Sequence, residues 1–496
     1  MRGVARWALL FSLAACTEEA RFTLRVEGAS RAEVDPLTDP RLTVLRILDD
    51  QTGRAIGEAT VLPGQKHAIG TMPPGELDLR VEGLSQSGLL LALGRTRAAH
   101  LSTDAPRGVL VALRKPMGLV LSSSGLDLVD TAASSDQGAS IPIAGARAVA
   151  ATHDGRSLLV AAESSLARLS TSTLTEEARS DLAGNARALA VDPRDRTVAA
   201  LLADRVVLIG VDGIGQPTGE IGPQAALLAA PLAAAFSRDG ETLYVVSGAL
   251  PACGGGGQSL VSIERTSGAT AASIALDQPV ADVAVHAGTG RVLLAAPCAG
   301  KVLALDPSGG AITDLFAAPG ASDLAAVGDA VVVVGDAALS GPASLTVGDL
   351  VGGSASQVAW DPPRFSGTFS DPRAQSRVDL LVAPTRLHAR DVSLSADGRR
   401  ALLSASLDYE GMFPALAPGN GFSCQGVLQA STEGVWGIDL SSGATWLERR
   451  AQETVRTCKL SCVLQALPVP FEIQCQGRGV AQPFQTRGVH FLFGGT

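Results

Sequence analysis

Apolar and polar residues alternate with a period of two over much of residues 20–107. The runs 22–26, 42–48 and 76–81 show this alternation most clearly, and turn-forming residues separate them. Successive side chains of a strand point to opposite faces, so this period places the apolar residues on one face. A sheet with one buried and one solvated face is typical of antiparallel structure. The pattern predicts a small β-sandwich over residues 16–107.

A longer repeat begins at residue 108 and continues to about residue 450. Its unit is an apolar strand, a tight turn at Asp-Gly or a substitute, a second apolar strand and a third strand. The turns fall at positions 155, 195, 240, 290, 328 and 398, which gives steps of 40, 45, 50, 38 and 70 residues. A period near 40 residues with three or four strands per unit is typical of a β-propeller. With a further unit over residues 108–145, we predict an all-β chain with about seven blades. An array of β-sandwiches is the alternative.

The segments 236–246 and 394–403 share one phrase: a strand, Ser-x-Asp-Gly and a second strand. This phrase resembles the YVTN/lactonase-like and YncE-like β-propellers, and residues 16–107 resemble small immunoglobulin- or transthyretin-like modules. The propeller resemblance implies a fold and says little about function, because the fold hosts many activities. We also expect the strand 489–493 to pair into the first blade, which would close the ring and remove its free edges.

The first 16 residues have the parts of an export signal. Arg2 and Arg6 provide the positive region, residues 7–13 form a short apolar region, and two alanines precede Cys16. The apolar run is much shorter than the roughly 20 residues that span a bilayer. Residues 1–15 are therefore predicted to be a signal peptide.

The sequence Leu-Ala-Ala-Cys at 13–16 resembles the lipobox of bacterial lipoproteins. The resemblance implies that Cys16 becomes the mature N-terminus and carries diacylglycerol on its sulfur. Thr17 stands where an Asp would favour retention in the inner membrane, so the sorting rule of Gram-negative lipoproteins implies the outer membrane. The expected location is the cell envelope, with the chain anchored by lipid on the periplasmic or the surface side. An ordinary signal peptide with a chance cysteine is the alternative.

Composition narrows the classes of partner. The chain has 496 residues, a net charge of −9 and 4% aromatic residues. Nucleic-acid binding needs a basic face, so this balance argues against it. Beyond the signal, no apolar stretch is long enough to cross a bilayer. We expect the membrane, through the lipid, and an envelope protein or a small molecule as partners.

Six cysteines remain after Cys16, an even number in a chain predicted to enter an oxidising compartment. Cys253 and Cys298 follow the second strands of neighbouring repeats and are predicted to bridge the two loops. The segment 463–474 reads as a hairpin, which suggests one bridge between its flanking cysteines. The other two would then pair, although three pairings remain open and a zinc site is a weaker alternative. These four are Cys424, Cys458, Cys462 and Cys475.

Two segments break the repeat, near 352–387 and near 407–434, and residues 451–496 form a cysteine-rich tail with the predicted closing strand. In a chain with few aromatic residues, the insertions concentrate them, and aromatic and Arg side chains dominate protein interfaces. A satellite core under long loops is the alternative. The partner-binding candidates are Trp360, Arg364, Phe365, Phe369, Tyr409, Phe413 and Phe422.

No residue pattern indicates catalysis. The six histidines are scattered, no metal site is predicted, and His153 and His286 are interpreted as surface turn residues. The only cofactor-like group expected is the acyl lipid on Cys16. The leading hypothesis is a non-enzymatic binding or scaffold propeller that acts through the face with the B–C and D–A loops. The alternative is a hydrolase or lyase of the lactonase-like class, perhaps dependent on a metal, with acidic residues at the channel.

Overall fold

The computed structural model describes residues 20–493 with internal gaps at 51–52, 62–65, 73–74, 102–107, 123, 133–137, 183, 216–227, 250–252, 254–256, 309, 340, 372–375, 416–421, 465–466, 475 and 478–485. Mostly antiparallel sheets make up the larger part of the described chain, and helix is almost absent from it, which confirms the predicted all-β class. Within these residues, no helix has the length and apolar character needed to cross a membrane. Cys16 lies outside the described residues.

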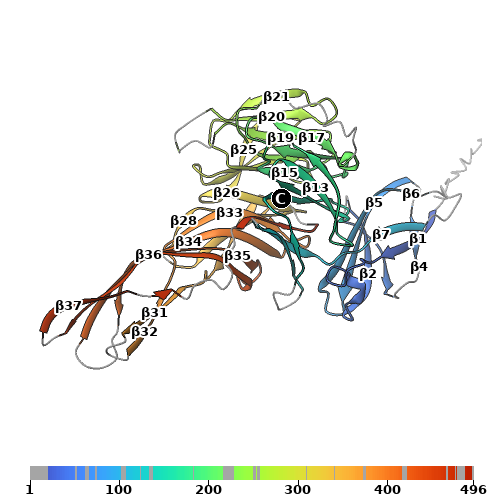
Figure 1. The fold of residues 1–496 in the computed structure, drawn as a ribbon. Helices are drawn as coiled ribbons and strands as arrows, with labels where there is room; N and C mark the ends of the chain where they lie inside the picture. The colour runs from blue at the N-terminus through green and yellow to red at the C-terminus, as the bar shows by residue number, and fades with distance from the viewer. Residues whose placement is uncertain are drawn as a thin grey trace, which may run out of the picture.

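Two sheets form the N-terminal sandwich (Figure 1). The first contains β1 (Ala20–Glu27), β4 (Lys66–Met72) and β7 (Gly108–Ala112), and the second contains β2 (Leu42–Asp49), β3 (Ala55–Thr60), β5 (Gly75–Ser85) and β6 (Leu90–Leu101). The core between them is fully buried and includes Leu24, Leu45, Ile47, Leu79 and Val111. β7 pairs in parallel with β1, so this strand belongs to the sandwich and not to the start of the propeller, where the repeat placed it.

The propeller contains seven successive sheets in the described chain, numbered here as blades 1 to 7, with strands A to D from the inside outwards. Blade 1 has β39 (Thr486–Phe491), β8 (Met117–Ser122), β9 (Gly125–Asp130) and β10 (Ser140–Pro142). Blade 2 has β11 (Ala146–Ala151), β12 (Ser157–Ala162), β13 (Ser165–Ser170) and β14 (Glu176–Asp181), and blade 3 has β15 (Ala188–Val191), β16 (Thr197–Leu201) and β17 (Val206–Gly210). Blade 4 has β18 (Pro231–Phe236), β19 (Thr242–Ser247), β20 (Ser259–Glu264) and β21 (Thr270–Ala275).

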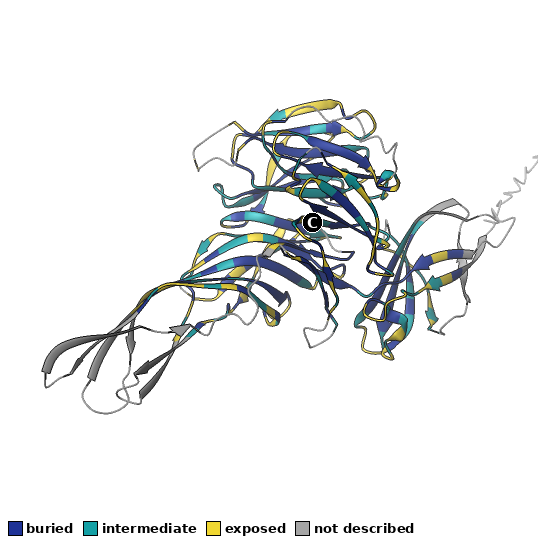
Figure 2. Cartoon of the chain, viewed as in Figure 1, coloured by how far each residue is buried: buried dark blue, intermediate teal, exposed yellow. Residues whose placement is uncertain are grey.

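The later blades follow the same order. Blade 5 has β22 (Asp282–Val285), β23 (Val292–Ala296), β24 (Lys301–Leu305) and β25 (Ile312–Ala317), and blade 6 has β26 (Ala321–Val327), β27 (Ala330–Gly335), β29 (Ala343–Asp349) and β30 (Ser354–Trp360). Blade 7 has β33 (Arg386–Leu394), β34 (Arg400–Ala415), β35 (Phe422–Asp439) and β36 (Thr445–Leu464), with the short β28 (Ala337–Ala338) beside β33. Buried residues concentrate in strands A to C, whereas the fourth strands β14, β21 and β30 are largely exposed (Figure 2).

The C-terminal strand closes the ring, as the sequence predicted. β39 pairs with β8 through Val489 and Val120, and its other neighbours are the inner strands β33 and β11. Each inner strand likewise contacts the inner strands of the blades before and after it. Phe491 is completely buried between blades 7 and 1. The first and last blades are therefore joined by a strand from the opposite end of the chain.

The structure explains the Ser-x-Asp-Gly motif of the A–B turns. In blade 4, the Ser237 hydroxyl donates to the Asp239 carboxylate at 2.6 Å, and the same carboxylate accepts the Glu241 N–H at 3.0 Å. The Gly240 N–H bonds the Ser237 carbonyl, and Gly240 has a φ of +72°, a region that favours glycine. Only the glycine is left-handed, so this is a longer turn than the two-residue hairpin that the motif suggested. Serine and aspartate hold the turn, and glycine reverses the chain.

An arm projects from blade 7, away from the sandwich (Figure 1). It is built from the outer ends of β34, β35 and β36, together with β37 (Leu467–Gln474) and a small sheet of β31 (Phe365–Asp371), β32 (Ser376–Val382) and β38 (Gln476–Gly477). The predicted insertion 407–434 is thus a continuation of the β34–β35 hairpin. The other insertion, 352–387, contains β30, which is the outer strand of blade 6, and the β31–β32 hairpin.

Aromatic residues of these insertions form a core at the base of the arm. Trp360, Phe365 and Tyr409 are at most 1% exposed. The Trp360 ring lies 5.8 Å from that of Trp436, and the Phe365 ring lies 5.7 Å from that of Tyr409. Because these rings are enclosed, they cannot form the predicted partner surface, and the satellite-core alternative holds for them. Of the other candidates, Arg364 is exposed, and the side chains of Phe369, Phe413 and Phe422 lie outside the described residues.

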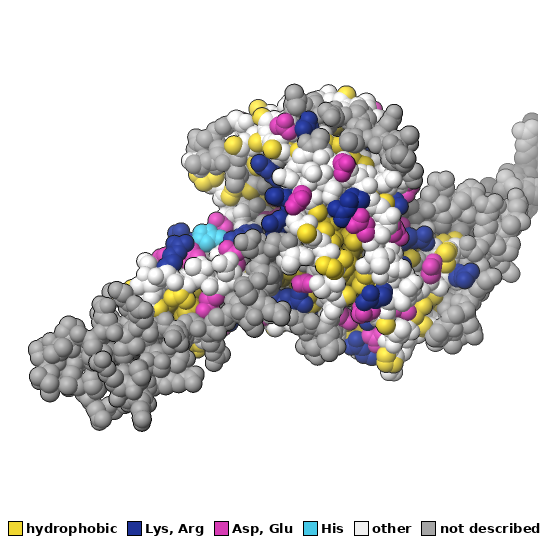
Figure 3. Space-filling view, viewed as in Figure 1, with side chains coloured by type: hydrophobic (Ala, Val, Ile, Leu, Met, Phe, Trp, Pro, Cys, Tyr) yellow, Lys and Arg dark blue, Asp and Glu magenta, His cyan; other side chains and the backbone are white. Residues whose placement is uncertain are grey.

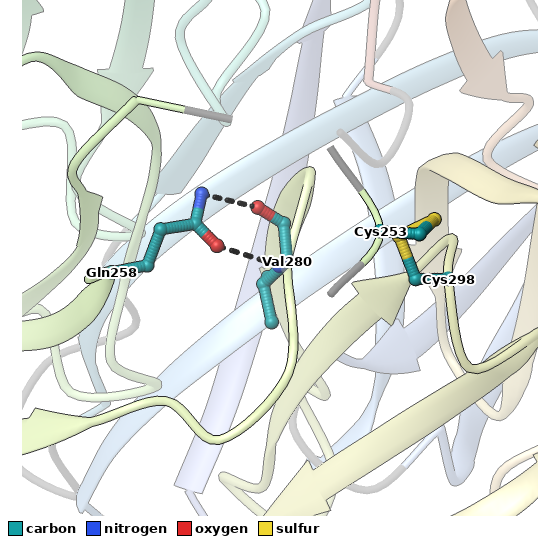
Figure 4. The surroundings of a disulfide bond; sticks show 4 residues. All are labelled: Cys253, Gln258, Val280 and Cys298. Atoms are coloured by element: carbon teal, nitrogen blue, oxygen red, sulfur yellow. Dashed lines mark hydrogen bonds between the residues drawn. A yellow bond between two sulfur atoms is a disulfide. The ribbon is translucent and has the colours of Figure 1, made fainter. Parts of the chain in front are cut away.

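The predicted bridge between Cys253 and Cys298 is present (Figure 4). It joins the B–C loops of blades 4 and 5. Beside it, the Gln258 side chain donates to the Val280 carbonyl at 3.0 Å and accepts the Val280 N–H at 2.8 Å. A covalent and a bidentate polar link therefore hold these two blades together at the same end of the ring.

Replacing Cys253 and Cys298 by Ser should lower the free energy of unfolding by about 2–4 kcal/mol, because the bridge closes a loop that spans 45 residues. Denaturant titration of the double variant and the wild type would measure this loss. The Gln258 bonds remain in the variant, so the propeller should still fold. An unchanged denaturation midpoint would mean that the polar link alone holds the two blades.

The strand register revises the predicted pairing in the arm. Cys424 stands opposite Cys462, whereas Cys458 stands opposite Leu428. A Cys424–Cys458 bridge would have to span four residues along the strand, about 13 Å, far beyond the Cα separation of a disulfide, which is at most about 7 Å. Cys458 does take part in a disulfide. Cys475 lies outside the described residues.

Candidate functional site

A hollow of about 800 Å³ lies between the sandwich and the end of the propeller that carries the A–B turns. The A–B turns of blades 2 to 6 line one side, and residues of the sandwich, including Asp50, Arg80 and Arg95, line the other. The Arg80 guanidinium donates to the Ala396 carbonyl at 3.4 Å, which links the sandwich to blade 7. Figure 3 shows a patch of apolar side chains, bordered by charged ones, on the propeller beside the sandwich.

Small apolar residues of the inner strands form the floor of the hollow. Ala150, Ala190, Ala235 and Ala326 are among them, with Phe236 at the edge. Inner strands converge on the axis of a propeller, so only small side chains fit between them. The floor is therefore a concave apolar surface, and polar and charged side chains of the turns and of the sandwich surround it. Small-molecule sites commonly combine such an apolar surface with a set of polar groups.

Two polar side chains of this wall line the hollow. Tyr244, on β19, is 7% exposed. His490, on β39, is 5% exposed, and its Nδ1 is buried without a partner among the described residues. Buried polar groups in folded proteins are nearly always hydrogen-bonded, and leaving one unpaired costs about 1–3 kcal/mol. Both side chains line the hollow, which marks it as a candidate binding site.

Electrostatics set the protonation of these groups. Burial, together with the charge of the nearby His153, lowers the pKa of His490 to about 4. Burial, with the charge of Asp239, raises the pKa of the Tyr244 hydroxyl. His490 is therefore neutral and Tyr244 protonated at neutral pH. On the propeller side, the wall thus offers two neutral hydrogen-bonding groups.

A row of three aspartates lies near the opposite end of the inner strands. Asp282, Asp323 and Asp391 occupy the same position of β22, β26 and β33, four residues before the A–B turn. Each accepts a backbone N–H from the next inner strand: Asp282 from Leu324 at 3.1 Å, Asp323 from Val392 at 2.7 Å, and Asp391 from Val489 at 2.7 Å. The inner edge of strand A has no neighbouring strand, so these carboxyl groups satisfy N–H groups that a sheet edge leaves open.

The three carboxyl groups also interact with each other. Asp323 lies between Asp282 and Asp391 in this row, and each carboxyl group affects the pKa of its neighbour. Burial raises the pKa of all three: that of Asp391 rises to about 7, and that of Asp323 rises well above its usual range because both neighbours add repulsion. Within the described residues, no group of three or more His, Cys, Asp or Glu side chains is arranged to hold a metal ion. Through its bonds to the neighbouring backbone, the row links successive blades.

Sequence reasoning placed the partner surface at the other end of the ring from the hollow. None of the predicted partner residues lines the hollow, which lies at the A–B end and not at the B–C/D–A end. His286, interpreted as a surface residue, is buried and bonds Thr289 at 2.7 Å and Asp329 at 3.2 Å. His153 is a half-buried turn residue 3.4 Å from Asp195. One feature of the sequence could have pointed to the hollow, because Tyr244 is a polar aromatic residue inside an apolar strand of the repeat.

Comparison with known proteins gives no family. No protein-family model and no curated protein matches the sequence. Among solved structures, the dihydro-heme d1 dehydrogenase NirN in complex with DHE is 15% identical and has a TM-score of 0.40, over 68% of this chain and 73% of that one. The Swd1 β-propeller domain of Myceliophteria thermophila is 10% identical with a TM-score of 0.41, over 68% of this chain and 96% of that one. A nidogen/laminin complex is 13% identical with a TM-score of 0.34, over 53% and 95%. No functional inference follows from similarities this low.

Proposed function

We propose that the protein is a lipid-anchored binding protein of the cell envelope, with its ligand site in the hollow between sandwich and propeller. The observation that carries the ligand site is His490, whose Nδ1 is buried in this wall without a hydrogen-bond partner among the described residues, while Tyr244 lines the same hollow. Such groups are costly in an empty protein and are compensated when a ligand bonds them. A non-enzymatic role fits these groups, since neither is part of a nucleophile–base pair.

The hollow can be tested by filling it. In Ala235→Trp, the indole would occupy space at the floor, and binding of the neutral apolar dye N-phenylnaphthylamine should be lost. Fluorescence titration of the mature chain would measure this binding, and circular dichroism would verify the fold. Ala272→Trp is the matched control, because Ala272 is exposed on the outer strand β21. If Ala235→Trp folds and binds the dye as the wild type does, the hollow is not the site.

The envelope location depends on Cys16. Several acyl chains together give a stable anchor, since each buried methylene contributes about 0.8 kcal/mol. Cys16→Ser should therefore move the protein from the membrane fraction to the soluble fraction of the envelope. Fractionation and immunoblotting would measure the change, with Thr17→Ser as the matched control. Retention of Cys16→Ser in the membrane fraction would contradict the lipid anchor.

A further inference from the structure

Four aspartates and four arginines line the hollow, but they are not all joined in ion pairs with each other. Asp50 pairs with Arg95 at 3.3 Å, and Asp329 lies 3.2 Å from the ring of His286. Asp239 already accepts bonds from Ser237 and Glu241 within its own turn. The carboxylates at the rim are thus engaged by neighbouring groups of the protein.

Two arginines at the rim form no ion pair with the described residues, although the charge of Arg194 acts on the nearby Asp239 and lowers the pKa of that carboxyl group. Arg194 and Arg238 lie on the A–B turns of the adjacent blades 3 and 4, and both are exposed and line the hollow. No carboxylate of the described residues lies within 4 Å of either guanidinium group, the limit for an ion pair. The Arg238 guanidinium donates to the Gly288 carbonyl of blade 5 at 2.7 Å, which holds it beside the hollow. Both arginines are therefore available for an anion, and Arg binds planar anionic groups well because of its fixed fork of donors.

The adjoining wall has the complementary chemistry for the rest of such a ligand. It is apolar along the inner strands, and the protonated Tyr244 hydroxyl can donate to an oxygen atom. A buried free carboxylate, which would repel an anion, is absent from the described wall. We propose that the hollow binds an amphipathic organic anion, with its apolar body against the inner strands and its acidic group at Arg194 and Arg238. This inference rests on the proposed function, because it names the class of ligand for the same site.

Two dyes of similar shape distinguish the contribution of the ligand's negative charge to binding from the contribution of its apolar part. Anilinonaphthalene sulfonate is an amphipathic anion, and N-phenylnaphthylamine carries the same rings without the sulfonate. The mature chain with Cys16→Ser would be titrated with each dye and followed by fluorescence. For the double variant Arg194→Gln/Arg238→Gln, we expect the Kd of the sulfonate to rise at least about tenfold, because two charge-assisted hydrogen bonds are lost. The Kd of the neutral dye should not change.

Arg187→Gln is the matched control, since Arg187 is exposed just before the inner strand β15, at the other end of the channel. It should leave the Kd of both dyes unchanged. Equal affinity of the wild type and the double variant for the sulfonate would overturn the anion inference while the hollow stays a site. If Ala235→Trp leaves the binding of both dyes intact, the proposed function fails instead.

Discussion

Deleting the C-terminal segment, residues 486–493, should abolish the folded propeller. It contains β39, which is strand A of blade 1, and its Val489, Phe491, Leu492 and Phe493 are all at most 4% exposed. Burying such a side chain contributes about 1.5–3 kcal/mol, so the four together contribute roughly 6–12 kcal/mol. That range is comparable to the whole stability of a typical protein, about 5–15 kcal/mol. The deletion would also expose the edge of β8 and a gap in the ring.

Circular dichroism, gel filtration and limited proteolysis would detect the loss of structure. A milder variant than the deletion is Phe491→Ala. We expect it to lower the free energy of unfolding by about 3–5 kcal/mol while the ring stays closed. The matched control is Phe316→Ala, since Phe316 is also buried but lies in strand D of blade 5, away from the closure. Cooperative unfolding of the deletion variant with an unchanged midpoint would show that the ring does not depend on β39.

The second large effect concerns pH and the three linked aspartates. An acid whose pKa is raised by folding stabilises the protein below its unfolded value and loses that contribution as pH rises through the folded value. Asp391 has an unfolded value near 3.8 and a folded value of about 7, and the pKa of Asp282 and Asp323 is raised as well. The protein should therefore become less stable between about pH 4 and just above pH 7, by an amount on the order of a few kcal/mol.

Asp323→Asn should remove much of this loss. The amide is neutral at every pH, its oxygen can still accept the Val392 N–H, and its NH₂ can donate to the carboxylates on both sides. We expect little change at pH 5 and a gain of about 1–3 kcal/mol at pH 8, because the neutral amide removes one of three buried carboxyl groups whose ionisation is opposed by burial and by the neighbouring carboxyl groups. Thermal unfolding across this pH range would measure both. Asp314→Asn, an exposed aspartate at the rim of blade 5, is the matched control and should not alter the pH profile.

Asp323→Ala separates the two roles of the side chain. It also removes the charge, but it leaves the Val392 N–H without its acceptor, so it should destabilise the protein at both pH values. If Asp323→Asn and the wild type lose the same stability between pH 5 and pH 8, the row does not titrate as its geometry indicates.

Much of the fold was predictable because its signals are local. The Ser237–Gly240 turn recurs with its period because serine, aspartate and glycine each meet a need of that turn. The Cys253–Cys298 bridge followed from two cysteines at matching places of neighbouring repeats. The pairing in the arm was not predictable in this way, because the register of β35 with β36 opposes Cys424 to Cys462. Register depends on how long strands align over many residues, and residue spacing alone does not specify it.

The candidate site was not predictable from the sequence. Trp360, Phe365 and Tyr409 stood out by composition, yet they pack together because the two insertions meet at the base of the arm. Tyr244 and His490 are 246 residues apart in the sequence, and each lies in a strand with an ordinary apolar pattern. Only the closed ring, with the sandwich placed over one end, brings both to one wall beside Arg194 and Arg238.

The sequence by itself determined the class of fold, the repeat with its turns, the strand that closes the ring and one disulfide. Each of these follows from residues that are neighbours along the chain or occupy the same place in successive repeats. The tertiary structure decided where the aromatic residues are buried, why three inner strands carry an aspartate, and which end of the propeller is hollow. Those features depend on contacts between blades and between domains, where side chains from distant parts of the chain share one enclosed space and one local dielectric environment.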